Sequence, residues 1–337
     1  MKFCCFILLV STLAANEKFS FPDEWESHQG TIMIFPAKHS YLKKANKLQR
    51  EFAEIANKIQ KREQVYVFTH VDDLNSAKKL LDPEVKLVSG REYRIDWARD
   101  NSPMIVRSKS GKRKAVCFEF NGWGKKYDGW QNDRGVNLAI ARELNLPIVK
   151  SDLVLEGGAI EIGSGPKGLT GILTEQCVLN PNRTDWNKQK VEKELKEKLG
   201  LDHLVWIPKG LNPDPITDGH VDGLLKFIRK DTVLLHTTDF KKDINYKNCQ
   251  IALKILKKEG FKVIELPLAD DIVHMNFYIG SGGTTAYVPI CGDPKQDNPA
   301  LKIIGKFFKE VIPVKSVAIS EAGGGIHCYT MQIPAKK

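Results

Sequence analysis

The feature that most constrains the fold is a repeated alternation of short β-rich runs with amphipathic helical segments. Apolar side chains recur three and four residues apart in five segments, at about residues 40–61, 133–143, 188–199, 247–258 and 299–309. Runs of β-branched and aromatic residues lie between them, at residues 31–35, 65–68, 116–120, 232–235, 277–279 and 286–288. This alternation predicts a mixed α/β fold.

The spacing of the helices limits the possible architectures. The last four recur every ~50 to 60 residues, at the upper end of the periods that indicate a repeated supersecondary unit. A ring of five α/β units would produce this spacing, and so would a doubly wound α/β sheet, because both alternate strands with helices. No run rich in Pro, Gly or Ser and no block of charge divides the chain, so residues 16–337 are expected to form one domain.

The N-terminus carries a strongly apolar run, Phe3–Leu13, preceded by one lysine and followed by two alanines. The run is too short to span a bilayer. It predicts a secretory signal peptide over residues 1–15 and a protein that is secreted or in the secretory pathway. A cytoplasmic N-terminus that packs onto the fold is the alternative, because the basic part holds a single lysine and two cysteines follow it.

Cysteine usage and charge argue against several classes of protein. Five widely spaced cysteines follow the N-terminal segment, with no CxxC pair: Cys117, Cys177, Cys249, Cys291 and Cys328. This pattern is neither a disulfide framework nor a zinc ribbon, and a free catalytic thiol would account for the odd number. The net charge of +10 comes from lysines spread among glutamates on helical faces. Such a distribution indicates a solvated surface and no nucleic-acid groove.

Cys328 follows a strand-like stretch and three adjacent glycines, Gly323–Gly325. Glycine lets the backbone approach a ligand closely, which a packed strand does not need, so the run favours a placed nucleophile. The alternative is a turn followed by a buried structural cysteine. A histidine and acids elsewhere in the chain support the nucleophile, because the partners of a thiol meet in space and not in sequence.

Three further polar clusters carry chemistry beyond what packing needs. The first, at residues 96–103, contains Asp100 and forms a loop that precedes an apolar strand. The second is Glu156, where burial would raise the carboxyl pKa unless a cation or donor meets it. The third places Asp218, His220 and Asp222 on one face of an extended segment, because side chains alternate there. The plainer interpretation of each cluster is a polar turn.

The histidine of the third cluster has two chemical interpretations. Flanked by carboxylates, His220 would have a raised pKa, would act as an acid or base near neutral pH, and could lower the pKa of the Cys328 thiol. With Asp222 it could instead hold a divalent metal, but no second ligand pattern such as HExxH supports that. His327 would point to the opposite face of a strand from Cys328 and is the weaker candidate.

The number of acids indicates the charge of the substrate. An acyl-transfer triad needs at most one acid, to orient its histidine. The excess suggests a cationic substrate, and a guanidinium fits best. It is planar, always charged and presents forked donors, so paired carboxylates can hold it while a thiolate attacks its central carbon. Each charge-assisted hydrogen bond contributes roughly 1.5 to 3 kcal/mol.

Six motifs then carry a family resemblance: WARD at 97–100, FNGWG at 120–124, LEGG at 155–158, NPNR at 180–183, TDGHVD at 217–222 and GGIHC at 324–328. In this order they resemble the agmatine deiminase and bacterial-type peptidylarginine deiminase family, over about residues 21–332. The resemblance implies a five-bladed α/β propeller of repeated ββαβ units with a central active site, in the guanidine-modifying superfamily. It also implies a single deiminase catalytic domain with no metal and no organic cofactor.

Carried over position by position, the resemblance assigns the chemistry. It implies that Cys328 is the nucleophile, which forms a covalent amidino-thioether intermediate. It makes His220 the group that protonates the departing ammonia and then activates water, with assistance from Glu156.

The remaining positions concern the substrate. By resemblance, Asp100 and Asp222 hold the guanidinium, and Trp97 and Trp123 line the substrate channel.

One position departs from the family pattern. Ile216 stands where agmatine enzymes of the family usually carry an acid for the distal amine. Asp214, between two prolines, could replace that acid only if the bend turns it inward. Residues 121–127 hold no arginine pair that could bind a peptide carboxylate.

By overall resemblance to the family, the expected function is hydrolysis of agmatine to N-carbamoylputrescine and ammonia, in putrescine biosynthesis. The alternatives are a deiminase that forms citrulline from free or peptidyl arginine, an amidinotransferase, and a secreted binding protein that has lost catalysis. The expected partners are a small cationic guanidinium substrate and, as one option, a second copy of the chain in a homodimer, with no nucleic acid and no membrane span.

Overall fold

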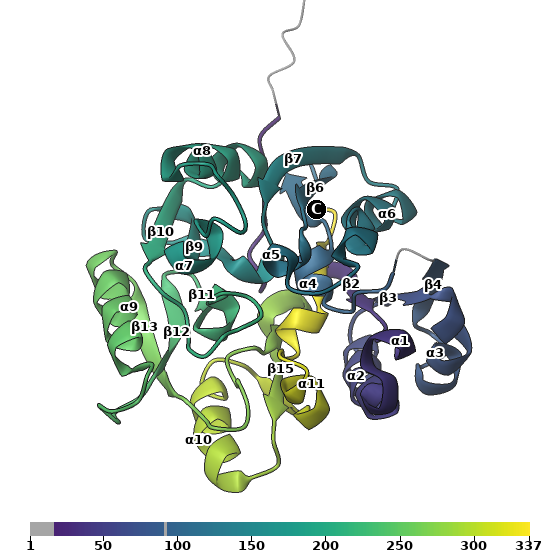
Figure 1. The fold of residues 1–337 in the computed structure, drawn as a ribbon. Coiled ribbons are helices and arrows are strands. Elements are labelled where there is room, and N and C mark those ends of the chain that lie inside the picture. The colour runs from purple at the N-terminus through teal and green to yellow at the C-terminus, as the bar shows by residue number, and fades with distance from the viewer. Residues whose placement is uncertain (1–16, 91–92) are drawn as a thin grey trace, which may run out of the picture.

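The computed structural model describes residues 17–90 and 93–337. The predicted signal peptide, residues 1–15, lies outside the described part of the chain. The described residues form five β-sheets arranged in a ring, with helices on the outside (Figure 1). In the same part of the chain, no helix is long and apolar enough to cross a membrane.

Four of the sheets are built from consecutive ββαβ units. The first two strands of each unit pair antiparallel, and the second and third pair parallel across a helical connection. In chain order the elements are β5 (Met104–Ser108), β6 (Arg113–Glu119), α6 (Val136–Glu143) and β7 (Ile148–Val154); β8 (Ile160–Gly165), β9 (Gly168–Thr174), α8 (Lys188–Leu199) and β10 (His203–Ile207); β11 (Leu225–Arg229), β12 (Thr232–Thr237), α9 (Tyr246–Lys258) and β13 (Lys262–Pro267); β14 (Tyr278–Ile279), β15 (Thr285–Ile290), α10 (Pro294–Ile304) and β16 (Glu310–Lys315).

The fifth unit joins the two ends of the chain. Its first strand is the C-terminal β17 (Met331–Pro334), which pairs antiparallel with β2 (His28–Ile34). The unit continues through α2 (Ala45–Gln60) to the parallel strands β3 (Val65–His70) and β4 (Lys86–Gly90). The ring is therefore closed by strand pairing between segments that lie far apart in sequence.

Shorter elements connect or extend the units. They are β1 (Phe19–Ser20), which pairs with β5, and α1 (Lys38–Tyr41), η1 (Leu42–Lys44), η2 (Val71–Asp73), α3 (Leu74–Leu80), α4 (Ala98–Asn101), α5 (Gly122–Lys125), η3 (Trp130–Asp133), η4 (Gly157–Ala159), α7 (Glu175–Val178), η5 (Val221–Gly223), η6 (Ser281–Gly283), α11 (Val317–Glu321) and η7 (His327–Tyr329).

The burial pattern explains the two kinds of apolar run in the sequence. In α2 the buried apolar side chains recur three and four residues apart and form one face: Leu48, Phe52, Ile55 and Ile59. Burial of each contributes about 1.5 to 3 kcal/mol. In β12 consecutive residues are buried. Val233 and Leu235 pack with the residues of α9, and Leu234 packs with residues around β14 on the opposite face.

The predicted architecture, a ring of five ββαβ units, is confirmed, and the doubly wound sheet is excluded. The helix predicted at 188–199 has those bounds in α8. The helix predicted at 299–309 is wrong in position, because α10 begins at Pro294. The Asp293 side chain accepts a hydrogen bond from the Lys295 amide there, and proline suits the first turn of a helix.

Candidate active site

Each ββαβ unit places a polar residue shortly before its first strand. These residues are Asp100 in α4, Glu156 before β8, Asp222 in η5, Asn276 before β14 and Cys328 in η7. Because the five units surround a common centre, their equivalent positions converge there (Figure 1). A cavity of about 550 Å³ opens at this centre, and four of the five residues line it, with Glu156 buried beside it.

The Cys328 thiol lies against carboxylates. Its Sγ donates to Oδ2 of Asp222 at 3.7 Å, and its backbone N–H donates to Oδ1 of Asn276 at 3.0 Å. The same Asn276 amide donates to Oδ2 of Asp222 at 3.1 Å, so one side chain positions both groups. Burial, and then the charges of Asp222 and Asp100, raise the pKa of the Cys328 thiol well above its ordinary value.

The segments around Cys328 and His220 differ from the predicted strands. Cys328 follows the helix α11 and lies in the 3-10 helix η7, and Asp222 lies in η5. The prediction that His220 lowers the thiol pKa is wrong for this arrangement, because burial and two carboxylates dominate the surroundings of the sulfur.

His220 lies between two acids. Its Nδ1 is 3.8 Å from Oδ1 of Asp100, and its Nε2 is 3.5 Å from Oε2 of Glu156. Burial alone would lower the pKa of His220, but Asp100, the neighbouring Cys177 thiol and Glu156 outweigh it and hold that pKa well above its ordinary value. The imidazole therefore carries a proton at neutral pH and can donate it.

Glu156 is paired with a buried arginine. Nε of Arg183 donates to Oε1 of Glu156 at 2.7 Å, and both side chains are 1% exposed. Burial opposes ionisation of Glu156, but His220 and Arg183 outweigh it and hold the carboxyl pKa below its ordinary value. Arg183 is thus a cation that keeps the buried Glu156 ionised, although its role was not predicted.

Asp218 does not line the cavity with His220 and Asp222, contrary to the extended-segment prediction. Its carboxylate accepts from Nη1 of Arg183 at 3.0 Å and from Nζ of Lys126 at 2.6 Å. It anchors the loop from outside the cavity.

Asp100 is held in place by two donors. Nε1 of Trp123 donates to its Oδ2 at 2.9 Å, and the Gly158 amide donates to its Oδ1 at 3.0 Å. Burial raises the pKa of Asp100, His220 opposes that effect, and Asp222 and Glu156 add to it.

The two predicted tryptophans line the cavity. Trp123 has a left-handed backbone, with φ of 53°, which is uncommon for a bulky residue, and its indole N–H donates to Asp100. Trp97 stacks on Tyr329 with ring centroids 4.6 Å apart.

Two glycines allow the backbone to reach this centre. A Cβ on Gly158 would lie 2.7 Å from Nδ1 of His220 and 2.9 Å from Oδ1 of Asp100. A Cβ on Gly324 would overlap Cζ3 of Trp97. Side chains at these positions would displace the residues around the cavity, so the glycine runs serve close approach, as the sequence predicts.

A buried polar network holds the Asp222 carboxylate in place. Nδ1 of His327 is 2.9 Å from Oδ2 of Asp222, and its Nε2 is 3.0 Å from Oε2 of Glu24. Nζ of Lys226 also donates to Oε2 of Glu24, at 2.9 Å. His327 therefore touches the site through Asp222 and does not line the cavity.

Sequence reasoning missed three residues of this site. Asn276 occupies in the fourth unit the position that Asp222 occupies in the third, but no local sequence pattern marks it. Arg183 stands in the NPNR motif but was given no role. Glu24 lies in a segment with no distinguishing sequence pattern.

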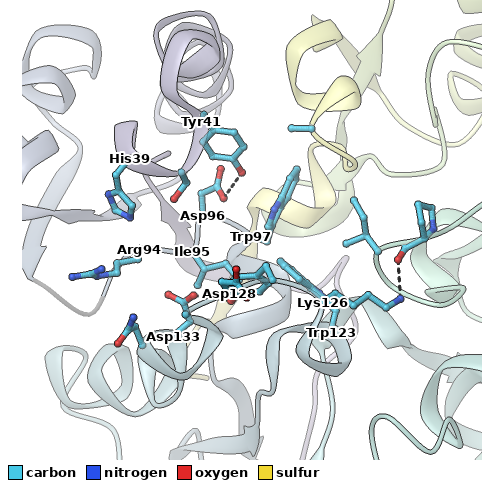
Figure 2. A pocket seen from close by; sticks show the side chains of 17 residues that line it. His39, Tyr41, Arg94, Ile95, Asp96, Trp97, Trp123, Lys126, Asp128 and Asp133 are labelled. Carbon is cyan, nitrogen blue, oxygen red and sulfur yellow. Dashed lines mark hydrogen bonds between the residues drawn. The ribbon is translucent and has the colours of Figure 1, made fainter.

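A second cavity, of about 560 Å³, adjoins the first and shares Trp97, Trp123 and Ile216 as lining residues (Figure 2). Asp214, the acid two residues before Ile216, lines the catalytic cavity. Its carboxylate accepts from the amides of Ile216, Thr217 and Gly219 and from the Thr217 hydroxyl, and it orders the loop before His220.

The ring of five ββαβ units, with a thiol, a histidine and several carboxylates at its centre, defines a class: the guanidine-modifying hydrolases, which act on C–N bonds of amidines. Residues 20–334 match the model of the Porphyromonas-type peptidyl-arginine deiminase family. The chain belongs to this family.

Relatives and solved structures agree over nearly the whole length. The chain is 34% identical to an agmatine deiminase of Pseudomonas aeruginosa, over 95% of this chain and 96% of that one. It is 32% identical to a putative agmatine deiminase of Mycoplasma capricolum, over 96% and 97%. The structure of the agmatine deiminase of Enterococcus faecalis superposes with a TM-score of 0.87 at 25% identity, over 95% and 96% of the two chains.

Proposed function

We propose that the chain is an agmatine deiminase, which hydrolyses agmatine to N-carbamoylputrescine and ammonia. The observation that carries the proposal is the charge of the cavity around Cys328. Its lining includes five acids: Asp100, Asp214, Asp222, Asp243 and Asp270. None of the described residues that line it is lysine or arginine. Such a cavity favours a dication over a zwitterion.

The same charge pattern discriminates between agmatine and arginine. The two share a guanidinium and a methylene chain, but arginine also carries an α-carboxylate. In this cavity that carboxylate would lose water without gaining a cationic partner, at a cost of about 1 to 3 kcal/mol or more. Ile216 offers the methylene chain an apolar contact, and Asp243 and Asp270 supply negative charge for the distal ammonium.

Formation of the first covalent bond uses Cys328 and two acids. Asp100 and Asp222 bind the guanidinium, and its positive charge offsets the two carboxylates that raise the thiol pKa. The thiol then releases its proton to solvent, and the thiolate attacks the central carbon to form a C–S bond. The carboxylates bind the flat cation from its edge and leave its face open to sulfur.

Loss of ammonia and hydrolysis use His220. Its imidazolium donates a proton to one terminal nitrogen. The C–N bond then breaks and ammonia departs, and an amidino-thioether cation remains on Cys328. The neutral imidazole then accepts a proton from water, whose oxygen adds to the same carbon. Collapse breaks the C–S bond, returns a proton to sulfur and releases N-carbamoylputrescine. Glu156, ionised beside Arg183, holds the imidazole in position.

Ammonia release from agmatine, arginine and arginyl peptides, measured side by side, tests the substrate. We expect the highest kcat/KM with agmatine, and a preference for arginine would contradict the charge argument. Added amine acceptors should leave the product unchanged, whereas transfer of the amidine to an amine would identify an amidinotransferase.

A matched pair of variants tests the nucleophile. Cys328→Ser should abolish ammonia release and keep the circular dichroism spectrum of the wild type. Cys249→Ser, at a buried cysteine of α9, is the control and should retain activity.

The biological setting is also part of the proposal. N-carbamoylputrescine would feed putrescine synthesis, and residues 1–15 would be removed as a secretory signal peptide. Mass spectrometry of the mature N-terminus from the native source tests the cleavage, and an intact Met1 would contradict it. The protein would form a homodimer, which light scattering on the purified protein checks.

A further inference from the structure

Outside the catalytic cavity, one group of side chains has the composition of a transition-metal site. His39 lies in α1, His70 ends β3, and Asp73 ends η2. One ligand atom from each residue lies within 4.8 Å of the other two. The group borders the second cavity, which His39 lines at the edge away from Trp123 (Figure 2).

We propose that His39, His70 and Asp73 bind a divalent transition metal such as Zn²⁺. Two imidazole nitrogens and one carboxylate oxygen are a common ligand set for this ion, and the fourth position stays open to water. The site is separate from the proposed chemistry at Cys328 and does not depend on it.

The carboxylate of the site is already oriented. Asp73 is 1% exposed, and its Oδ1 accepts from Nε2 of Gln49 at 3.0 Å, while its Oδ2 accepts from the Lys38 amide at 3.2 Å. Gln49 is itself fixed, because its amide also donates to the Pro36 carbonyl at 2.8 Å and its oxygen accepts from Ser76 at 2.9 Å. Hydrogen-bonded carboxylates of this kind are typical of metal sites, because the bonds orient the oxygens and leave lone pairs for the ion.

The first histidine is oriented by a neighbouring acid. Nδ1 of His70 accepts from the Asp72 amide at 3.3 Å and lies 3.4 Å from the Asp72 carboxylate Oδ2. A metal bound at Nε2 would move the ring proton to Nδ1, which would exchange the amide hydrogen bond for one to that carboxylate. A carboxylate, a histidine and a metal in series fix the ring and strengthen the ligand.

The second histidine, His39, is the ligand that a metal ion can reach from solvent. His39 is exposed, and its ring lies 5.4 Å from the His70 ring at an angle of 68°. Asp73 and Asp133 lie close enough to the His39 imidazole to act on it electrostatically, and their negative charge favours a bound cation, whereas Arg94 opposes it.

A metal here would connect α1 to the end of β3. Tyr41, the last residue of α1, donates to Oδ1 of Asp96 at 2.7 Å (Figure 2). Asp96 precedes Trp97, which lines the catalytic cavity. The ion would therefore stabilise the wall between the two cavities, and an excess of Zn²⁺ should raise the Tm of the full-length protein.

Zinc titration of the metal-free full-length protein, in competition with a chromophoric chelator, tests the site. We expect one Zn²⁺ per chain, with affinity reduced at least about 10-fold in His39→Gln and in His70→Gln. His203→Gln, at a half-buried histidine in β10, is the matched control and should keep wild-type affinity. Because His39 is exposed, its variant tests the site even if the buried His70 variant fails to fold.

Cobalt absorption spectroscopy locates the ion. Three N and O ligands predict a Co²⁺ spectrum without a thiolate-to-metal charge-transfer band. Such a band would place the metal at Glu156, Cys177 and His220, whose ligand atoms also lie within 4.8 Å of one another, and would overturn the proposal. Zinc affinity that is unchanged in His39→Gln, or absent from the wild type, would overturn it as well.

Discussion

Replacement of Glu24 by glutamine removes one buried negative charge from beneath the catalytic cavity. Oε2 of Glu24 is 2.9 Å from Nζ of Lys226, 3.0 Å from Nε2 of His327 and 3.7 Å from Nη2 of Arg99, and its Oε1 accepts from the Ile279 amide at 2.8 Å. The amide of glutamine has nearly the same shape, so the change tests charge and leaves packing in place.

The structure sets the size of the effect. Removal of one partner from a buried ion pair costs about 3 to 5 kcal/mol, because the other charge stays buried without compensation. In Glu24→Gln the nearest remaining acid to Lys226 is Glu161, at 3.7 Å. We therefore expect the free energy of unfolding, measured by urea denaturation at about pH 7, to fall by about 3 to 5 kcal/mol.

Glu161→Gln is the matched control. Glu161 is also buried, but it makes the longer contact with Lys226 and accepts from the Phe227 amide at 3.1 Å. Its replacement should cost about 1 to 3 kcal/mol.

Activity gives a second readout for Glu24. His327 holds the pKa of Asp222 below its ordinary value, against the opposing effect of burial. Substrate binding needs the Asp222 carboxylate, so activity is present above that pKa and is lost as pH falls through it. Glu24 acts on Asp222 through His327. Without the Glu24 charge, His327 stabilises the Asp222 carboxylate less, the Asp222 pKa rises, and the acid limb of kcat/KM should move to higher pH in Glu24→Gln. If Glu24→Gln destabilises no more than Glu161→Gln and leaves the acid limb unmoved, the network does not act as described.

Three further predictions concern other parts of the site. Burial raises the pKa of Asp96 from 3.8 to about 6, so Asp96 stabilises the fold below the unfolded pKa and loses this contribution as pH rises through the folded one. Asp96→Asn should remove about 3 kcal/mol of pH dependence from urea unfolding between about pH 4 and pH 7, and an unchanged profile would refute it. Gly158→Ala places a Cβ 2.7 Å from Nδ1 of His220 and should lower kcat about 100-fold in an ammonia-release assay; near-normal turnover would show that the site tolerates the displacement. Arg183→Met removes the arginine that pairs with both Glu156 and Asp218, with His220 as the remaining cation beside Glu156, and should lower the urea unfolding free energy by about 3 to 5 kcal/mol, whereas a cost under about 1 kcal/mol would argue against a buried ion pair.

The sequence predicts the repeated ββαβ unit better than it predicts where each helix begins or how the ring closes. Apolar periodicity predicts the bounds of α8 because its buried residues, Val191, Leu195 and Leu199, recur at helical spacing between polar ones. It misplaces α10, whose start depends on the Asp293 cap. Pairing of β17 with β2 is a contact between chain ends that no local pattern contains.

The candidate site shows the same division. Cys328, His220 and Asp222 stand out in sequence because each is flanked by glycine or acid residues in an unusual local pattern. The backbone conformations of Cys328 and Asp222 were predicted incorrectly, because short 3-10 turns have no periodicity to detect. His220, with φ of −50° and ψ of 142°, is close to extended, as predicted. Asn276 and Glu24 act through hydrogen bonds to residues far along the chain, so only the three-dimensional arrangement identifies them.

The covalent intermediate on Cys328 tests the central proposal most directly. Wild-type enzyme in turnover with agmatine is quenched in acid, and intact-mass spectrometry followed by peptide mapping locates any adduct. The proposed mechanism predicts one adduct per chain, with the mass of agmatine minus ammonia, on the peptide that contains Cys328. Agmatine consumption with no adduct under any quench time, or an adduct on Cys177 or Cys291, would contradict it.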